Sequence, residues 1–533
     1  MTFLPVADRE LRVAARRKST YRIRSWTAVT AIAMTWLFLG LSGLSSTRGA
    51  AGGEVFTVVA WYAFGLCLLA GVFLTADCLS EEKREGTLGL LFLTDLRGYD
   101  VVSGKFIARG LNAFYGLLAI LPAMGIPLLV GGVTGGQFWK TALAMLNALF
   151  VSLAAGMLVS ARGREPQRAM GGTLFILFLL VAGLPAAVEI GSLLHRSSAW
   201  SKLAWISPAW PFSCALKSAY RTHMEFWGAL FASHMFGWCM LALASGWLPR
   251  HWQERCSAAR LGRSSWRGLR GGSSERKAQG QERERLLSIN PVLWLVGTQA
   301  GVRRIAWGTV LIWGAVAGSS ALFGKERMVS FVMNGYVARP FGFLLKALLA
   351  AQACRFFVEA RSNGALEMLL STPLTSREII RGQSLALRRS FLWPVLAFAG
   401  IMFLPDAIQV IRAVLIGRPE HLGEAALGSF VTGICAVRML IDSYTVCVFA
   451  MALALTLKRP TMALGTAIVA VLILPSILCW FDVVANLVFI VWSSTKLQQD
   501  LRWMVARQTT ASGLAPVTAR PPGTQVPRPV ASV

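Results

Sequence analysis

The sequence predicts an all-α membrane protein, a polytopic helical bundle of about 12 transmembrane helices in two parallel six-helix repeats. Three observations predict it: a lipid-like composition with recurring apolar runs, positive charge gathered on one side, and one loop that occurs twice. Of the 533 residues, 55% are hydrophobic and only 15% are charged. A water-soluble globular protein is nearly excluded by that balance.

Apolar runs long enough to cross a bilayer, which takes about 20 residues, recur along the whole chain. Pro475 and Asp482 mark the point where one long apolar segment could end and the last one begin. The predicted spans are 26–44, 55–76, 110–133, 138–161, 170–191, 226–248, 305–324, 333–353, 391–411, 431–456, 461–477 and 479–495.

The net charge of +27 would suggest nucleic acid as the partner of a soluble protein, so the placement of Lys and Arg decides. With the N-terminus inside, these spans put more than four times as many Lys and Arg on the cytoplasmic side as outside. That asymmetry follows the positive-inside rule. We therefore expect a multi-pass plasma (inner) membrane protein with both termini cytoplasmic, with anionic membrane lipids as partners and no nucleic acid.

Composition divides the chain further. Residues 1–249 form a first six-span unit, whose residues 4–18 read as an amphipathic interfacial helix or, alternatively, as an unstructured basic leader. Residues 250–286 are a basic linker rich in Gly and Ser, which cannot form a core. Residues 287–507 form a second six-span unit, and residues 508–533 read as a disordered Pro-rich tail.

One predicted cytoplasmic loop occurs twice. Residues 81–105 align without gaps with residues 359–383, an offset of 278. Random matching over 25 positions would give about two identities. The seven identical pairs are Glu81/Glu359, Gly86/Gly364, Leu88/Leu366, Leu91/Leu369, Thr94/Thr372, Leu96/Leu374 and Gly104/Gly382. Because an even number of spans separates the copies, the two units have parallel topology.

Each copy predicts a helix that ends, a short apolar element and a new helix. Gly86 and Gly364 can end the incoming helix, because glycine tolerates the left-handed conformation. The leucine-rich stretch that follows is too short to cross the bilayer. It must bury its apolar side against the membrane face, its own bundle or another protein. In the second copy, Thr375 and Glu378 fit a capping box that starts the next helix.

The pattern of Glu, then Gly-(Thr/Ala)-Leu-x-x-Leu-Leu, then Thr-(Asp/Pro)-Leu after a second span resembles the permeases of type-2 ATP-binding-cassette (ABC) transporters, which are largely exporters. The resemblance covers residues 1–250 and 287–505. In that family, this loop contacts the nucleotide-binding subunit; the plain alternative is a structural connector. The resemblance implies coupling roles for Glu81, Gly86, Leu88, Leu91 and Thr94, and for Glu359, Gly364, Leu366, Leu369, Thr372 and Pro373. Asp95 departs from the usual Thr-Pro.

Motifs for catalysis or cofactor binding are missing from the sequence. The nearest phosphate-binding candidate, 98–105, has one residue too many between its glycines, and Phe106 replaces the required Ser or Thr. The histidines and cysteines show no metal-ligand spacing. We therefore expect no enzyme activity, cofactor or metal, and ATP hydrolysis on a separate ABC ATPase subunit.

The best ionic feature inside a predicted span is Arg438 with Asp442, one helical turn apart. The two side chains could form a structural ion pair or line a transport pathway, or the span boundary could be misplaced. Arg339 and Lys346 in the eighth span could extend to the interface or mark the end of a shorter span.

These features together favour the permease component of an ABC exporter. Two alternatives stay open. A secondary transporter driven by an ion gradient needs acidic residues inside its spans, and Asp442 is the one reasonable candidate. A non-transport membrane scaffold would need a site outside the bilayer, and the sequence shows none.

Overall fold

The computed structural model describes most of the predicted spans, and every statement below concerns the described residues. In those ranges all regular elements are helices. The described residues are 8–12, 18–42, 48–93, 96–163, 166–185, 188, 202–216, 222–251, 284–296, 300–323, 338–362, 364–372, 374–403, 411, 420–457, 465–468 and 484–497.

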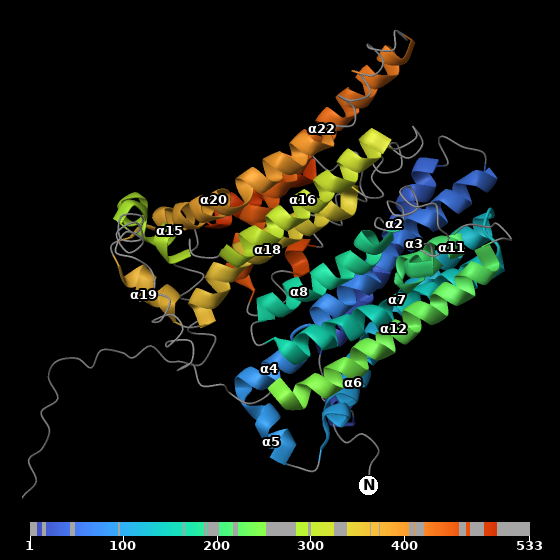
Figure 1. The fold of residues 1–533 in the computed structure, drawn as a ribbon, viewed down its shortest axis with the longest axis horizontal. Helices are drawn as coiled ribbons and strands as arrows, with labels where there is room; N and C mark the ends of the chain where they lie inside the picture. The colour runs from blue at the N-terminus through green and yellow to red at the C-terminus, as the bar shows by residue number, and fades with distance from the viewer. Residues whose placement is uncertain are drawn as a thin grey trace, which may run out of the picture.

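The first half of the chain forms one helical bundle, drawn in blue to green in Figure 1. Helix α3 (Arg48–Ala70) continues through a π-helical turn, η1 (Gly71–Thr75), towards the short helix α4 (Cys78–Glu85). The long helices are α2 (Lys18–Ser42), α3 (Arg48–Ala70), α6 (Gly98–Val130), α7 (Gly135–Arg162), α8 (Pro166–Phe178, extended by the π-helical η2, Leu179–Gly183) and α12 (Thr222–His251). Two short elements, η3 (Ala204–Ile206) and α11 (Ala209–Leu216), come between η2 and α12 in the chain.

The second half forms a neighbouring bundle, drawn in yellow to red (Figure 1). It opens with the short α15 (Pro291–Val296). The other helices are α16 (Ala300–Phe323), α18 (Ala338–Ser362), α19 (Ala365–Ser371), α20 (Ser376–Met402) and α22 (Glu420–Thr456). Residues 484–497 add one more helix in the last predicted span.

Seven helices among the described residues are long and apolar enough to cross a membrane, which confirms an all-α polytopic membrane protein. They are Gly52–Glu85, Gly98–Val130, Gly135–Arg162, Met224–Pro249, Phe341–Arg361, Ser376–Met402 and Gly428–Thr456. Three shorter apolar helices, Thr27–Gly40, Ala169–Gly183 and Val484–Leu497, fall within or close to further predicted spans, and α16 overlaps the seventh. Most of the predicted span 461–477 lies outside the described residues, so the total of twelve stays a prediction.

Several helices run well beyond the apolar stretch that predicts each span. The span predicted at 110–133 overlaps the helix Gly98–Val130, and the span predicted at 391–411 overlaps the helix Ser376–Met402. The 33 residues of α6 would measure about 50 Å, against about 30 Å for the bilayer core. Hydropathy detects only the apolar part of such a helix, whereas backbone hydrogen bonding continues into polar residues.

The centre of the first bundle is α7, whose small residues let its neighbours approach closely. A Cβ on Gly156 would lie 2.1 Å from the Thr75 hydroxyl oxygen, and a Cβ on Gly71 would lie 2.1 Å from the Ser152 carbonyl oxygen. The Ser152 hydroxyl donates to the Leu68 carbonyl at 2.5 Å and accepts from the Gly71 amide at 3.0 Å. Since these groups belong to the π-helical turn and the residues before it, α7 holds the turn in place.

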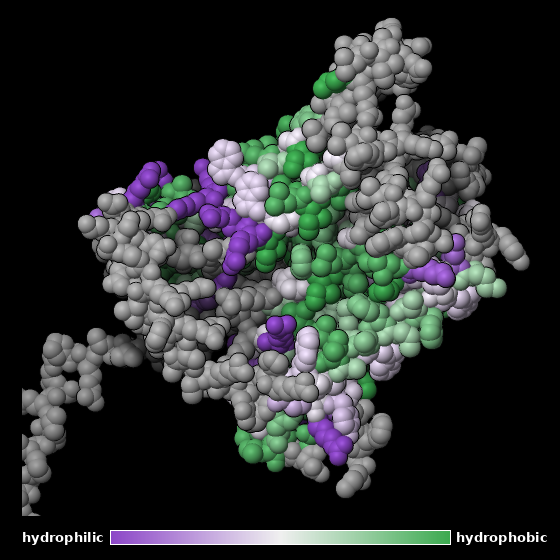
Figure 2. All heavy atoms as spheres, in the orientation of Figure 1, coloured by the Kyte–Doolittle hydropathy of each residue, from purple (hydrophilic) through white to green (hydrophobic). Residues whose placement is uncertain are grey.

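The two bundles pack on each other through α8 and α18. The rings of Phe178 and Phe341 meet edge to face with their centroids 4.6 Å apart. One cluster of buried apolar side chains runs from Leu177 in the first half to Phe341 and Trp313 in the second. Hydrophobic surface covers much of the face shown in Figure 2, as a bilayer-facing surface requires.

Candidate functional site

The duplicated loop folds in the same way in both copies. We call residues 78–93 the first foot and residues 356–371 the second foot. The first foot contains α4 (Cys78–Glu85), Gly86 and α5 (Thr87–Leu93). The second contains the end of α18, Gly364 and α19. The helices that follow, α6 and α20, begin at Gly98 and Ser376. The starts and ends of α5 and α19, and the starts of α6 and α20, are all separated by the offset found in the sequence.

The break in each foot is a left-handed glycine. Gly86 has φ 72° and ψ 0°, and Gly364 has φ 69° and ψ 0°. An added Cβ would meet no atom within 4 Å at either position, so the backbone conformation, not crowding, requires glycine. Left-handed backbone costs an ordinary residue roughly 1–2 kcal/mol. The predicted helix break is confirmed in both copies.

The apolar side of each foot packs against its own bundle. Leu88 and Leu366 are 2% and 1% exposed. Leu91 and Leu369 are partly buried against the same core. Of the three surfaces that the sequence left open, the bundle is therefore the one that receives these leucines. Their expected role in coupling stays a prediction. Because these leucines are buried, that role would be to anchor the foot to its bundle.

The residues that each foot exposes are not the buried leucines. Sequence reasoning did not identify these exposed residues. Leu90 is 66% exposed, Leu93 is 82% exposed and Met368 is 72% exposed. Leu90 and Met368 occupy equivalent positions. The signal was present in the helical spacing, since Leu90 lies two residues from the buried Leu88 and so on a different face. Figure 1 shows α5 and α19 projecting at the same end of the molecule.

A basic residue, to which sequence reasoning assigned no role, also binds each foot to the end of a long helix, α7 or α22. Lys83 donates to the Ala161 carbonyl at the end of α7. Its equivalent, Arg361, donates to the Leu457 carbonyl at 2.9 Å, just past the end of α22. Free carbonyls and the negative end of the helix dipole favour a cation at a helix C-terminus. A foot therefore cannot shift without disturbing the central helix of its bundle.

The helix after each foot starts at an acidic cap. The predicted capping box is confirmed: the Thr375 hydroxyl accepts from the Glu378 amide at 3.3 Å, and the Glu378 carboxylate accepts from the Thr375 amide at 2.7 Å. In the first copy the Asp100 carboxylate accepts from the Arg97 amide at 3.0 Å.

Five further residues have an expected coupling role. Glu81 and Glu359 are exposed. Thr372 closes α19, because its hydroxyl donates to the Leu369 carbonyl at 2.6 Å. Thr94 and Pro373 lie outside the described residues. Coupling through any of them stays a prediction.

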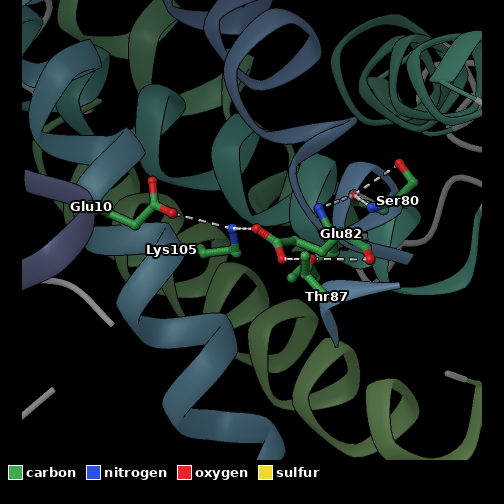
Figure 3. A network of polar contacts seen from close by, with 7 residues as sticks. Glu10, Ser80, Glu82, Thr87 and Lys105 are labelled. Atoms are coloured by element: carbon green, nitrogen blue, oxygen red, sulfur yellow. Dashed lines mark hydrogen bonds and ion pairs between the residues drawn. The ribbon is translucent and has the colours of Figure 1, made fainter. Parts of the chain in front are cut away.

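The first foot carries a polar network around a buried lysine, shown in Figure 3. Lys105 on α6 is 4% exposed, and its Nζ lies 2.7 Å from Glu82 Oε1 on α4 and 3.5 Å from Glu10 Oε1. The Thr87 hydroxyl donates to the Glu82 carboxylate. The network therefore joins α4, the start of α5, α6 and the short helix containing Glu10. Sequence reasoning considered Lys105 only as a phosphate-binding lysine and rejected it.

Inside the second bundle, Asp442 has partners that the sequence could not identify. Its carboxylate lies 2.7 Å from Lys346 Nζ on α18 and accepts from the Asn486 amide at 2.8 Å. The side chains of Lys346 and Asp442 are 15% and 7% exposed. Lys346 therefore lies within the packed span and does not mark its end. The expected pairing of Arg438 with Asp442 stays a prediction.

The first bundle has a polar contact at the related position. Asn147 on α7 donates to the Ser233 hydroxyl at 2.7 Å, and its carbonyl oxygen lies 3.1 Å from His234 Nδ1, both on α12. Residues 147–164 of the fourth predicted span align without gaps with residues 442–459 of the tenth, which makes Asn147 the equivalent of Asp442. In both bundles a polar residue at this point therefore joins the central helix to the last span of its half.

Comparison with known proteins gives two matches. Residues 50–249 match the model of the family described as ABC-2 family transporter protein. The chain is also 31% identical over 186 residues to the probable ABC transporter permease protein NosY of Stutzerimonas stutzeri, an alignment that covers 33% of this chain and 65% of that protein. The alignment thus covers less than two thirds of the length of that curated relative. Residues 50–249, which contain the first foot, are similar to the ABC-2 family of transporter proteins.

Proposed function

We propose that this chain is the transmembrane permease component of an ABC transporter and that a separate ABC ATPase subunit engages both feet. The observation that supports it best is the recurrence of one foot, with the same glycine break and the same buried leucine, at one end of the molecule (Figure 1). A fold that presents two equivalent projections at one end suits a pair of equivalent ATPase subunits.

The described contacts give a route for movement. Force on the exposed Leu90 or Met368 passes through the buried Leu88 or Leu366 into the bundle core. It also passes through Lys83 and Arg361 to the ends of α7 and α22. Tilting of these central helices would alternate access to a pathway between the bundles, in the manner of repeats that rock against each other.

The domain organisation, the orientation in the membrane and the direction of transport are proposed from the sequence. Two fused six-span units, 1–249 and 287–507, are joined by the basic linker and sit in the inner membrane with both termini cytoplasmic. Transport is directed outward, as in the exporters that the duplicated loop resembles. The transported substrate is not specified by any described residue.

Ion-gradient coupling is the second candidate, and the buried Asp442 is the observation that favours it. Lys346 already neutralises this carboxylate at 2.7 Å. A carboxylate held in an ion pair is a poor carrier for an exchanging proton. The ATPase-driven mechanism therefore accounts for more of the structure.

The proposal is tested by changing the outward residues of the feet, which leaves the core untouched. The full chain, affinity-tagged and purified in mild detergent from its native host, should retain an ATP-hydrolysing subunit. We expect Leu90→Asp and Met368→Asp each to lower the retained ATPase activity at least about tenfold, since a desolvated charge at a contact costs more than about 1.4 kcal/mol.

Leu129→Asp is the matched control. Leu129 is 88% exposed and lies at the opposite end of α6 from the first foot, so this variant should retain the ATPase. Retention by all three variants, or no ATPase with the wild type, would contradict the proposal.

A further inference from the structure

We propose that Lys105 is a positioning residue that locks the first foot to its bundle, and that the second foot has no such lock and is the more mobile of the two. The inference deepens the proposed function, because it says that two equivalent projections respond unequally to their ATPase subunits. It rests on comparing equivalent positions of the two copies.

The lock of the first foot consists of three charged side chains from three segments. Lys105 is almost fully buried, and Glu82 and Glu10 are 20% and 28% exposed. Figure 3 shows the ammonium group between the two carboxylates. Because Glu82 also accepts the Thr87 hydroxyl hydrogen, the network reaches the first residue of α5. Charge-assisted hydrogen bonds of this kind are stronger than neutral ones.

The equivalent positions of the second foot cannot form this lock. The offset places Gln383 where the first copy has Lys105, and Ala360 where it has Glu82. Gln383 is fully buried, and within the described part of the chain neither polar atom of its amide has a hydrogen-bond partner. The ion pair between Glu82 and Lys105 therefore has no counterpart at the equivalent positions, Ala360 and Gln383.

Two other attachments are common to both feet. Both feet have a buried leucine, Leu88 or Leu366, and both have a cation on a helix end, Lys83 or Arg361. The first foot has one more, because the Ser160 hydroxyl on α7 accepts from the Leu79 and Ser80 amides at 2.8 and 3.1 Å, a contact that holds the start of α4 and does not reach α5. In the second half, Asn290 clamps α15 to α20 by donating to the Glu378 carbonyl at 2.9 Å. This hydrogen bond joins the residue before α15 to α20 and does not involve α19.

Hydrogen exchange of the full chain in lipid nanodiscs tests the inference without any ATPase. The seven residues of α5 and the seven of α19 serve as matched probes. We expect higher protection factors in α5 than in α19, because local opening of α5 must break the hydrogen bond from Thr87 to the Glu82 carboxylate that Lys105 holds in place. Lys105→Gln, which installs the residue of the second copy, should lower the protection of α5 about tenfold or more and leave α7 unchanged.

Two further variants separate positioning from simple loss of folding. Lys105→Arg keeps the charge and should preserve most of the protection of α5. The double variant Ala360→Glu with Gln383→Lys transfers the pair to the second foot and should raise the protection of α19. Equal protection of α5 and α19 in the wild type, or no response to Lys105→Gln and to the double variant, would overturn the inference. Because only the permease is measured, the outcome is independent of whether an ATPase is retained.

Discussion

Asp442 and Lys346 show how a charge is accommodated inside this bundle. Neither side chain is free to reach water, and each neutralises the other at 2.7 Å, with Asn486 supplying one more hydrogen bond. Removing one member of a buried pair is far more costly than removing both, because a lone charge stays behind. The pair gives each of these two charged residues a partner within the bundle.

This gives a prediction at the scale of single residues. Asp442→Leu should lower the stability of the purified chain by about 3–5 kcal/mol, since it strands Lys346, whereas Asp442→Leu with Lys346→Met should recover most of that loss. Thermal unfolding in detergent, followed by the exposure of buried cysteines, measures both. A double variant that is no more stable than Asp442→Leu would show that the two charges do not depend on each other.

Local sequence predicts some of these single-residue features and not others. The left-handed Gly86 and Gly364 and the cap at Thr375 follow from local sequence, and they were predicted. The partners of Lys105 and Asp442 were not, because Lys105 is separated from Glu82 by 23 residues, and Asp442 from Lys346 by 96 residues. Such contacts depend on how helices pack, which no local pattern specifies.

At the scale of elements, the π-helical turn η1 and α7 form one unit. The turn leaves backbone groups that ordinary helix bonding would satisfy, and Ser152 and Thr75 supply the missing contacts: the Thr75 hydroxyl donates to the Gly71 carbonyl at 2.9 Å or the Leu153 carbonyl at 3.0 Å. Polar side chains that bond between helices in this way stabilise membrane bundles. Since the turn lies between α3 and α4, its geometry sets the direction in which the first foot leaves the bundle.

The close approach of α7 to this turn predicts that a larger residue at Gly156 will destabilise the bundle. Gly156→Ala places a methyl group 2.1 Å from the Thr75 oxygen and 2.5 Å from the Gly71 carbonyl oxygen, so the helices must separate. We expect a loss of about 1–3 kcal/mol from overpacking, read as a lower melting temperature in detergent.

Gly116→Ala on α6 is the matched control, since an added Cβ there meets nothing within 4 Å. It should leave the melting temperature unchanged or slightly higher. If both variants unfold at the same temperature as the wild type, α7 does not hold the turn through this contact.

Helix existence was easier to predict than helix extent. Long apolar runs identified the spans because bilayer thickness sets their length. The helices α6 and α20 are longer than the predicted spans, because they continue through polar residues towards the feet. The apolar stretches of the feet could be located but not oriented. Leu88 and Leu90 are chemically identical, and only packing distinguishes the buried one from the exposed one.

For the whole molecule, duplication is the organising feature. Two bundles pack through Phe178 and Phe341, and each sends one foot to the same end of the molecule (Figure 1). The residues that match the ABC-2 family model, 50–249, include the first of these feet. The second foot is equivalent to the first in its backbone conformation, in the buried Leu366 and in the contact of Arg361 with a helix end.

The proposed function depends on one ATPase contact at each foot, and site-directed cross-linking measures that contact directly. In a chain whose nine native cysteines are replaced by serine or alanine, Leu90→Cys, Met368→Cys and the distant control Leu129→Cys would each be treated with a short bifunctional maleimide in native membranes. We expect Leu90→Cys and Met368→Cys both to cross-link to an ABC ATPase subunit and Leu129→Cys not to do so. Cross-linking at neither foot, or equally at Leu129→Cys, would contradict the account.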